Sequence, residues 1–483
     1  MLLIDGQWVP GNGDNFNSTD PSNSQQIWEG MTATADDVDR AFLAARKAFP
    51  SWSNTPFEKR VEIVQNLKQL AIDYKADLAE LIARETGKVL WDASGEAGAV
   101  AGKVDISLKA YDDRTGTSSL ETAFGRADLA HRPHGVFAVL GPYNFPAHLP
   151  NGQIIPALIA GNTIVYKPSE QCPAVGAFMA SLYQKAGVPD GVINMVQGAR
   201  DTGAAILDHD ELDGVLFTGS PGTGKFIHKK FGGRPEIVLA LEMGGNNPLL
   251  MWDVADAKAA ASIIFQSNFI TTGQRCTCAR RILLPVGEAG DDVIANLVDM
   301  RDNMTIGAWN DEDPTFMGPL ISADVASDVK RMADELATKH GGKVLRPMES
   351  LERSEAFVTP AILDVTGKEM PDEEIFGPVM QIIRVESFDQ GIQIANDTKY
   401  GLSAGLISDD TELWNLFRRN IRAGVVNFNR PTTGAAGSLP FGGPGASGNH
   451  NPGAYYSADF CAWPMASQIA ETVELQSSQG VKI

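Results

Sequence analysis

The chain has 483 residues, enough for about three domains and a large hydrophobic core. Hydrophobic residues make up 43% and charged residues 21% of it, which is an ordinary globular composition. The net charge of −20 argues against nucleic acid or an anionic membrane as the main partner. It also repels anions at long range, so an acidic substrate would need a local cationic pocket.

Cysteine usage and the N-terminus favour an intracellular setting. The four cysteines do not suggest a disulfide scaffold and fit a reducing compartment. Cys276 and Cys278 make a poor zinc site, because no nearby Cys or His pair completes four ligands, and we predict no metal. Met1–Gly6 has no basic region, and no apolar stretch approaches the roughly 18 residues that span a bilayer. We therefore expect a cytoplasmic protein outside the membrane.

Helices are predicted in the first part of the chain. Thr34 can cap a helix over residues 34–49, where apolar residues recur at helical spacing. A longer helix is predicted from about Phe57 to Arg84, with Gly87 as its stop signal. Residues 36–110 are therefore expected to be largely helical.

Strands and helices alternate from residue 136 to residue 241. Short apolar runs predict the strands, and the segments between them have helical patterns. The predicted strands are Val136–Leu140, Thr163–Tyr166, Ile193–Val196, Val215–Phe217 and Ile237–Leu241. Repeated strand–helix units imply a parallel sheet with helices on both faces, and such sheets bind ligands at the carboxyl ends of their strands.

A second α/β region is predicted from about Asn246 to Phe441, with a helix candidate at Val254–Phe265. The chain closes with the Gly- and Pro-rich segment Phe441–Gly453 and a polar tail after Met465. The fold class is therefore α/β.

A glycine-rich turn joins a predicted strand to a predicted helix. Gly219–Lys225 has the spacing of a G-x-x-x-x-G-K loop, but Phe226 stands where that loop needs a Ser or Thr for magnesium. A nucleotide triphosphatase is therefore an alternative, and a tight turn without a ligand is another. Glycines at a helix N-terminus still present free N–H groups to a phosphate.

Three other motifs place polar residues next to the ends of predicted strands. Tyr166–Glu170 offers a lysine and an acid, which suit a ribose, although such a turn is more often a solvated loop. Gly141–Pro146 places Asn144 near prolines, where an asparagine is usually a turn residue. Glu373–Val379, taken alone, is an acidic turn before a strand.

A cysteine and a carboxylate stand beside glycines. Gly273–Arg280 contains Cys276 between small and polar neighbours, and Leu241–Pro248 contains Glu242 before two glycines. A thiolate adds to carbonyls, and a carboxylate relays protons or activates water. Arg275 could lower the pKa of the thiol by favouring the thiolate. Taken alone, however, a cysteine is mostly a buried small hydrophobe and a glutamate mostly a surface residue.

Together these motifs resemble those of the NAD(P)-dependent aldehyde dehydrogenase superfamily, and Pro440–Gly443 matches a further family motif. The resemblance covers essentially the whole chain. It implies that Cys276 is the nucleophile and Glu242 the base. Asn144 would donate to the oxyanion beside the backbone N–H of Cys276. Tyr143 departs from the family pattern, which has Trp at this position.

The resemblance also implies an NAD site. The family turn that matches Phe217–Ser220 lies beside the pyrophosphate. Lys and Glu residues of the family contact the adenosine ribose, and a carboxylate there favours NAD over NADP. Other matches hold the nicotinamide ribose and pack near the nicotinamide. The implied cofactor residues are Lys167, Glu170, Gly219, Ser220, Pro221, Gly222, Thr223, Gly224, Glu374 and Phe376.

The implied fold is aldehyde dehydrogenase-like. It has a Rossmann-like cofactor domain (residues 1–114 and 134–244) and a second α/β domain that is catalytic (residues 245–447). A small oligomerisation element (residues 115–133 and 448–483) completes it. In the family this element pairs a hairpin with the C-terminal strand, so a homodimer or homotetramer is expected.

Further segments resemble the subfamily that oxidises N-succinylglutamate 5-semialdehyde in arginine breakdown by the succinyltransferase route. These segments are Tyr143–Gly152, Cys276–Arg281, Gly445–His450 and Tyr455–Met465. The loop at Gly434 and Ala435 resembles the anchor loop of glutamate-semialdehyde dehydrogenases, whose N–H groups hold a carboxylate. Arg430 and Arg275 are the other expected contacts of this small acidic substrate, although either arginine could instead form a surface or interdomain ion pair.

Three alternatives stay open. An NAD-dependent dehydrogenase of another acidic semialdehyde fits the same residues. A CoA-acylating aldehyde dehydrogenase is disfavoured by Glu242, since those enzymes generally lack this base. A non-catalytic binding or structural protein on the same fold is disfavoured by the joint presence of Cys276, Glu242 and Asn144.

Overall fold

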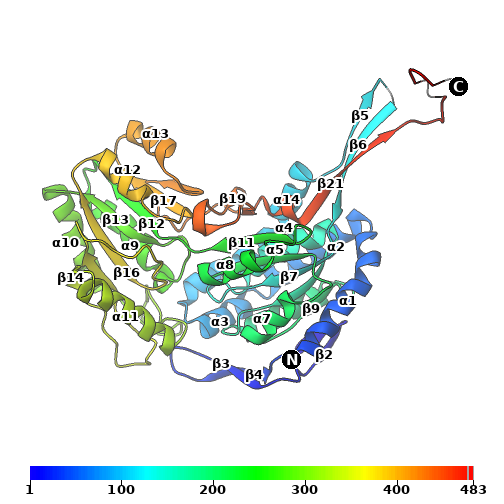
Figure 1. The fold of residues 1–483 in the computed structure, drawn as a ribbon. Coiled ribbons are helices and arrows are strands. Elements are labelled where there is room, and N and C mark those ends of the chain that lie inside the picture. The colour runs from blue at the N-terminus through cyan, green and yellow to red at the C-terminus, as the bar shows by residue number, and fades with distance from the viewer. Residues whose placement is uncertain (124, 476–477, 482–483) are drawn as a thin grey trace.

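The computed structural model describes residues 1–123, 125–475 and 478–481. An N-terminal lobe and a C-terminal lobe lie side by side, and each is built on its own sheet (Figure 1). A narrow arm of strands projects from the N-terminal lobe. Among the described residues, no helix combines the length and the apolar character needed to cross a bilayer.

The sheet of the N-terminal lobe explains the alternating pattern after residue 136. Its order is β11 (Val238–Met243), β10 (Gly214–Gly219), β7 (Val136–Leu140), β8 (Thr163–Lys167), β9 (Ile193–Met195), β1 (Leu2–Ile4) and β2 (Gln7–Val9). Neighbours from β11 to β9 are parallel, whereas β1 is antiparallel to both β9 and β2. The strands predicted between residues 136 and 241 are confirmed, with ends that differ by at most two residues.

Helices cover this sheet and fill the space beside it. They are α1 (Ala35–Ser53), α2 (Phe57–Asp73), α3 (Lys75–Thr86), α4 (Leu90–Arg114), α5 (His148–Ala160), α6 (Pro173–Lys185), α7 (Arg200–Leu207) and α8 (Pro221–Lys230). Thr34 caps α1 as predicted, in a capping box with Asp37. Gly87 ends α3 in a left-handed conformation, with a φ of 76°, which confirms the predicted stop signal.

The single long helix predicted from Phe57 to Arg84 is wrong, because the chain breaks at Tyr74 between α2 and α3. The ring of Tyr74 packs edge-on against Phe178 of α6, with 6.2 Å between the ring centroids. The Nζ atom of Lys185 lies 4.7 Å from the centre of the Tyr74 ring. Apolar spacing continues on both sides of the break, so the periodicity alone does not reveal it.

The C-terminal lobe carries the second predicted α/β region. Its sheet has the order β14 (Lys343–Arg346), β15 (Ala361–Asp364), β16 (Val379–Val385), β13 (Ala279–Pro285), β12 (Asn247–Met251), β17 (Ser403–Ile407) and β18 (Val425–Phe428). These strands are parallel except for the β14–β15 pair. The helices are α9 (Ala257–Phe269), the 3-10 helix η1 (Ile270–Gly273), α10 (Glu288–Asn303), α11 (Ala323–Thr338), α12 (Phe388–Asn396) and α13 (Thr411–Asn420).

The remaining elements join the lobes or form the arm. The hairpin of β3 (Asn15–Thr19) and β4 (Gln26–Met31) runs below the lobes in Figure 1. The chain returns through β19 (Pro440–Phe441), η2 (Gly445–Ser447), β20 (Gly453–Ala454) and α14 (Ser457–Cys461). The arm pairs β5 (Ser118–Thr122) with β6 (Gly125–Pro133), and β6 with β21 (Ala462–Ile469). The expected pairing of hairpin and C-terminal strand is therefore present.

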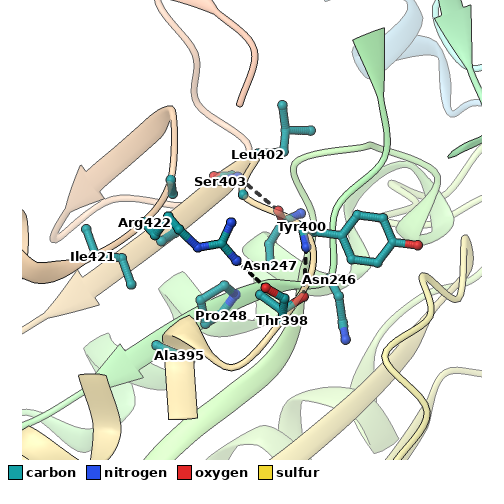
Figure 2. A pocket seen from close by; sticks show the side chains of 13 residues that line it. Asn246, Asn247, Pro248, Ala395, Thr398, Tyr400, Leu402, Ser403, Ile421 and Arg422 are labelled. Atoms are coloured by element: carbon teal, nitrogen blue, oxygen red, sulfur yellow. Dashed lines mark hydrogen bonds between the residues drawn. The ribbon is translucent and has the colours of Figure 1, made fainter. Parts of the chain in front are cut away.

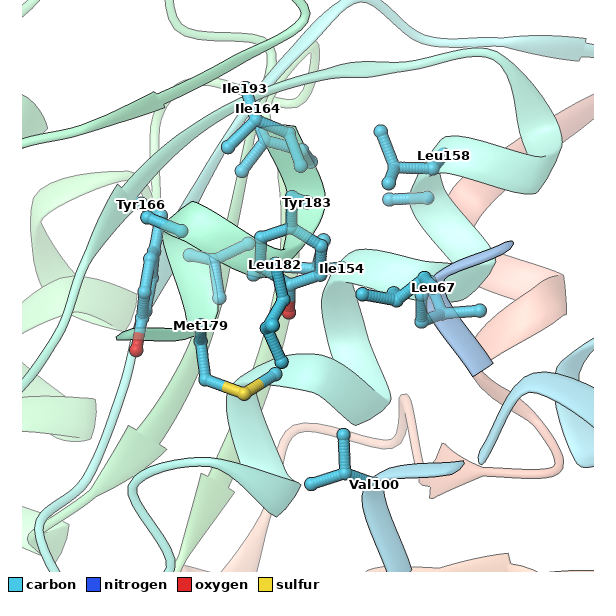
Figure 3. Packing of buried hydrophobic residues seen from close by; sticks show 14 of the residues in the cluster. Leu67, Val100, Ile154, Leu158, Ile164, Tyr166, Met179, Leu182, Tyr183 and Ile193 are labelled. Carbon is cyan, nitrogen blue, oxygen red and sulfur yellow. The ribbon is translucent and has the colours of Figure 1, made fainter. Parts of the chain in front are cut away.

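One apolar core holds α4, α5 and α6 against β8 (Figure 3). It brings together Val100 of α4, Ile154 and Leu158 of α5, Met179 of α6 and Ile164 of β8, all of them buried. The core therefore fixes α5, which follows β7 and the Asn144 loop, relative to the sheet edge.

A buried asparagine joins this core to the arm. Asn162 lies between α5 and β8, and its Oδ1 accepts from the N–H groups of His134 at 2.8 Å and Gly135 at 3.1 Å. Its Nδ2 donates to the carbonyls of Ala157 at 3.2 Å and Cys461 at 2.7 Å. One side chain thus ties the start of β7 to the ends of α5 and α14.

Asn162→Ala should lower the free energy of unfolding by about 2–4 kcal/mol, because each buried polar group left without a partner costs about 1–3 kcal/mol. The apparent melting temperature should fall by about 2–4 °C in a thermal unfolding experiment, since the unfolding entropy of a chain of this length is about 1 kcal/mol/K. The control is Asn303→Ala, since exposed Asn303 bonds Asp299 within its own helix. Equal melting temperatures for the two variants would contradict the role of Asn162.

Candidate active site

The parallel strands of the N-terminal lobe bring the predicted residues to one edge. Leu140 and Lys167 are paired at the ends of β7 and β8, and Thr218 of β10 lies opposite Glu242 of β11. Because these strands are in register, the loops after them emerge together. The Asn144 loop, the ribose turn, the glycine-rich turn and Glu242 therefore share this edge.

The C-terminal lobe turns the amino ends of its strands toward the same place. Cys276 lies just before β13, and Glu374 lies just before β16. A hydrogen bond of 2.9 Å from Asn144 Nδ2 to the Gln274 carbonyl crosses between the lobes. An amide group has two N–H donors, so this bond accounts for one of those of Asn144.

A left-handed turn places Cys276. Thr271, Thr272 and Gly273 have φ values of 55°, 55° and 69°. A Cβ atom on Gly273 would lie 2.2 Å from the Gly377 carbonyl oxygen, so this position requires glycine. The turn leaves Cys276 partly exposed before the chain enters β13.

The side chain of Asn247 holds the backbone at Cys276 and Cys278, where the turn leads into β13. Its Nδ2 donates to the carbonyls of Cys276 at 2.7 Å and Cys278 at 2.8 Å. Its Oδ1 accepts from the N–H of Ser403 at 2.9 Å, a contact that Figure 2 shows beside a shallow recess. Asn247 and Ser403 both line that recess, so the amide that holds the cysteine turn forms part of its wall.

Glu242 is a buried carboxylate with one orphaned oxygen. The residue is 7% exposed, and its Oε1 accepts from the N–H of Gly453 at 3.0 Å. Among the described residues, its Oε2 has no hydrogen-bond partner. Burial raises the pKa of Glu242 to about 8, although the Gly453 N–H acts in the opposite direction. A carboxylate oxygen without a partner is suited to hold and deprotonate a water molecule.

The Cys276 thiol is held in its protonated form. Burial raises the pKa of this thiol, and the negative charges of Glu374 and Glu242 raise it further. Arg280 acts in the opposite direction. The thiol therefore needs a base before it can attack a carbonyl.

Arg275 is engaged in an internal ion pair. Its Nη2 lies 2.6 Å from Asp92 Oδ1, and its Nε donates to Thr271 Oγ1 at 2.7 Å. The guanidinium carbon lies 5.1 Å from the centre of the Phe145 ring. The prediction that Arg275 favours the Cys276 thiolate is wrong, because Asp92 compensates its charge while burial and nearby carboxylates raise the pKa of the thiol.

Glu374 and Phe376 form the side of the site contributed by the C-terminal lobe. Glu374 Oε1 lies 3.4 Å from Arg280 Nη2, and burial raises the pKa of Glu374 to about 7, opposed by Arg280 and by the backbone N–H of Gly245. The ring of Phe376 meets that of Tyr143 edge-on, with centroids 6.0 Å apart. The segment thus contacts the Asn144 loop, where the nicotinamide end is predicted.

The predicted phosphate site is an open helix N-terminus. Gly219–Gly224 spans the end of β10 and the first turn of α8. Ser220 caps the helix by accepting from the N–H of Thr223 at 3.3 Å. A Cβ atom on Gly222 would meet nothing within 4 Å, whereas Gly224 is buried. The exposed first turn therefore fits a bound phosphate group.

Lys167 and Glu170 are neighbours at the end of β8. Lys167 Nζ donates to the carbonyls of Gly198 at 2.7 Å and Pro168 at 3.1 Å, and lies 3.4 Å from Glu170 Oε2. Burial lowers the pKa of Lys167, and Glu170 opposes this shift. The side chain of Glu170 is 49% exposed, which leaves its carboxylate open to a ligand.

Three of the predicted substrate residues lie between β18 and β19. Arg430, Gly434 and Ala435 are exposed. Asn427 Nδ2 donates to the carbonyls of Pro431 at 2.7 Å and Gly434 at 2.9 Å, so one amide closes the base of this loop. Arg275 lies outside this loop and pairs with Asp92 of α4.

Sequence reasoning missed several residues that hold the site. Asn247 ends the Gly244–Asn247 run, and the two amides of this run at the start of a strand are the available signal. Arg280 contacts Glu374, but a cation within a strand has no distinctive pattern. Gly453 acts through its backbone N–H, and every residue except proline has one, so no signal could have found it.

The chain is similar to known proteins along almost its whole length. Residues 8–463 match the model of the aldehyde dehydrogenase family. The chain is 52% identical to N-succinylglutamate 5-semialdehyde dehydrogenase 2 of Caulobacter vibrioides, over 100% of this chain and 99% of that protein.

Solved structures agree with this assignment. An aldehyde dehydrogenase of Bacillus cereus in complex with NAD+ has a TM-score of 0.90 and 28% identity, over 98% of this chain and 96% of that one. An NADP-dependent enzyme of E. coli has a TM-score of 0.89 and 29% identity, over 96% and 97% of the two chains. The fold alone therefore does not choose between NAD and NADP. The family match, the full-length relative and the shared fold together show that the chain belongs to the aldehyde dehydrogenase family.

Proposed function

We propose that this enzyme oxidises N-succinyl-L-glutamate 5-semialdehyde to N-succinyl-L-glutamate with NAD, in arginine catabolism by the succinyltransferase route. The observation that carries the substrate is the 52% identity, over the full chain, to a protein named for it. An NAD-dependent dehydrogenase of another acidic semialdehyde is the alternative. The buried Glu242 favours hydrolysis over acyl transfer to CoA, and Cys276 with Asn144 favours catalysis over a purely structural role.

The chain's own residues supply the covalent steps. The Cys276 thiol loses its proton to solvent water, and the sulfur attacks the aldehyde carbon. The second N–H of Asn144 and the backbone N–H of Cys276 donate to the oxyanion, and one such donor is worth about 3 kcal/mol. NAD, when bound, accepts the hydride that the aldehyde carbon gives up. Cys276 then carries a thioester.

Glu242 completes the cycle. It takes a proton from water, and the water oxygen attacks the thioester carbon. The carbon–sulfur bond breaks, and Glu242 gives its proton to the departing sulfur, which restores the thiol. The released carboxylic acid loses its own proton to solvent and leaves as the carboxylate product. The orphaned Oε2 of Glu242 is the atom suited to this proton transfer.

The cofactor residues fit a dinucleotide at the sheet edge. We propose that the first turn of α8, from Ser220 to Gly224, holds the pyrophosphate. Lys167 and Glu170 would hold the adenosine ribose, where the half-exposed carboxylate of Glu170 disfavours a 2′-phosphate. Gly219 and Pro221 shape the turn, while Glu374 and Phe376 would hold the nicotinamide end.

The acidic end of the substrate needs local donors in a protein of net charge −20. We propose that Arg430 and the N–H groups of Gly434 and Ala435 bind a carboxylate of the substrate. Their exposure and the closed base of their loop support this assignment. We also propose Arg275 as a substrate contact, although its charge is already paired with that of Asp92.

We also propose a homodimer or homotetramer that works in the cytoplasm. The arm carries apolar side chains that the chain itself leaves exposed, among them Leu120 at 68% and Trp463 at 43%. A second copy covering the arm would bury them. The cysteines at 172, 276, 278 and 461 are free thiols, as a reducing compartment favours.

Glu242→Gln should release about one NADH per active site in a burst and then stall, because the thioester forms but its hydrolysis lacks a base. Stopped-flow absorbance at 340 nm measures the burst, and Cys276→Ala is the control that should give no burst while still binding NAD. Steady turnover of Glu242→Gln near the wild-type rate would disprove the assigned role.

Thioester hydrolysis should become faster with pH through about 8, because Glu242 must be ionised to act and burial raises its pKa to that value. The rate constant should rise about tenfold between pH 7 and pH 9, as the ionised fraction does for a pKa of 8. Rapid quench of the acyl-enzyme at each pH measures it. A rate independent of pH over this range would argue against Glu242 as the base.

Glu170→Ser should narrow the preference for NAD over NADP, mainly by lowering the KM for NADP, because it removes the charge that repels the 2′-phosphate. Initial rates with each cofactor measure the ratio of kcat/KM values. The matched control is Glu236→Ser, an exposed acid beside β11 that pairs with Arg234. If neither variant changes the ratio, Glu170 does not contact the ribose.

A further inference from the structure

Lys103 of α4 is a buried lysine that the mechanism does not use. It is 6% exposed and lies on the buried face of the helix, with Asp92, Glu96 and Val100. Both acids of that face are already paired, Asp92 with Arg275 at 2.6 Å and Glu96 with a different lysine. In residues 1–123, 125–475 and 478–481, no hydrogen bond or ion pair to Lys103 is present.

The ammonium group lies where two glycines leave room. Lys103 Nζ is 3.5 Å from the place that a Cβ atom of Gly152 would occupy, and its Cε is 3.1 Å from it. The same nitrogen is 4.0 Å from the corresponding position on Gly437. Gly152 belongs to α5, and Gly437 belongs to the loop that carries Gly434 and Ala435. Lys103 therefore reaches the loop proposed to bind the substrate carboxylate.

A second unpartnered polar group accompanies it. His148 opens α5 four residues after Asn144, and its Nδ1 is buried without a hydrogen-bond partner among the described residues. Burial, followed by the charges of Lys103 and Lys88, lowers the pKa of His148 to about 3. The histidine is therefore neutral, and it offers a ring nitrogen beside the ammonium rather than a competing cation.

A buried cation without an acid partner indicates a missing anion. Charged groups inside proteins are normally paired, and this chain has an excess of acids from which a partner could have been chosen. Burial also lowers the pKa of Lys103 to about 8, so an anion that binds there stabilises the charged form. The proposed substrate carries two carboxylates at the end away from its aldehyde.

We propose that Lys103 binds a carboxylate of the substrate, with His148 as a neutral hydrogen-bonding neighbour, and thereby selects acidic semialdehydes. The juxtaposition of α4, the start of α5 and the 434–437 loop carries this inference, which rests on the proposed function. Lys103 contacts the substrate itself in this account and is a specificity-determining residue. Arg430 and the loop N–H groups would then hold the other carboxylate.

The test compares Lys103→Met with Lys109→Met, a variant of an exposed lysine on the same helix that pairs with Asp113. The substrates are N-succinylglutamate semialdehyde and propionaldehyde. Lys103→Met should raise the KM for the succinylated substrate by about 10–100-fold, the loss expected for one charge-assisted contact. Its kcat/KM for propionaldehyde should stay within about twofold of wild type, and Lys109→Met should match wild type on both substrates.

A second measurement is independent of turnover. Isothermal titration with the product, N-succinylglutamate, should show a similar loss of affinity in Lys103→Met. If this variant is insoluble, Lys103→Gln replaces it, with the same expected shift. An unchanged KM and product affinity, or an equal loss on both aldehydes, would overturn the inference and leave a packing role over Gly152. Failure of the proposed function is distinguishable, because wild type itself would then not oxidise the succinylated substrate.

Discussion

The site depends on how the backbone around Cys276 is held. Asn144 of the N-terminal lobe binds the Gln274 carbonyl, and Asn247 of the C-terminal lobe binds the carbonyls of Cys276 and Cys278. The turn just before Gln274, at Thr271–Gly273, adopts left-handed backbone conformations that other contacts must stabilise. Because both lobes bind the backbone of residues 274–278, the nucleophile, the oxyanion donor and the base keep their relative positions.

Burial then decides the chemistry of the ionisable groups. Glu242, Glu374 and Cys276 all have raised pKa values for the same first reason, the loss of water around them. A protonated thiol and a base that ionises near pH 8 suit a site that does not react until the substrate is in place. The same loss of water makes the unpaired Lys103 attractive to an anion, although the protein as a whole is strongly acidic.

Much of the fold could be predicted because its signals are local. The strands of the N-terminal sheet are short apolar runs with clear ends, and the motifs of Asn144, Glu242 and the predicted cofactor turns stand where those strands end. The break at Tyr74 could not be predicted, because it depends on a contact with Phe178 more than 100 residues away. Asn247 acts through distant partners in the same way.

The pairing of Arg275 shows the limit of reasoning from neighbours in the sequence. Its position next to Cys276 suggested an influence on the thiol, but Asp92 of α4 compensates its charge. Residues adjacent along the chain point in different directions, so adjacency does not establish which charges interact. The long-range ion pair decides the outcome, and no spacing rule reveals it.

The covalent intermediate is the most direct test of the account. Glu242→Gln protein is mixed with NAD and N-succinylglutamate semialdehyde, quenched in acid and digested for mass spectrometry. We expect one succinylglutamyl group, attached as a thioester to the peptide that contains Cys276, and its loss on treatment with hydroxylamine. An unmodified Cys276 peptide in a sample that has formed NADH, or an acyl group on another residue, would contradict it.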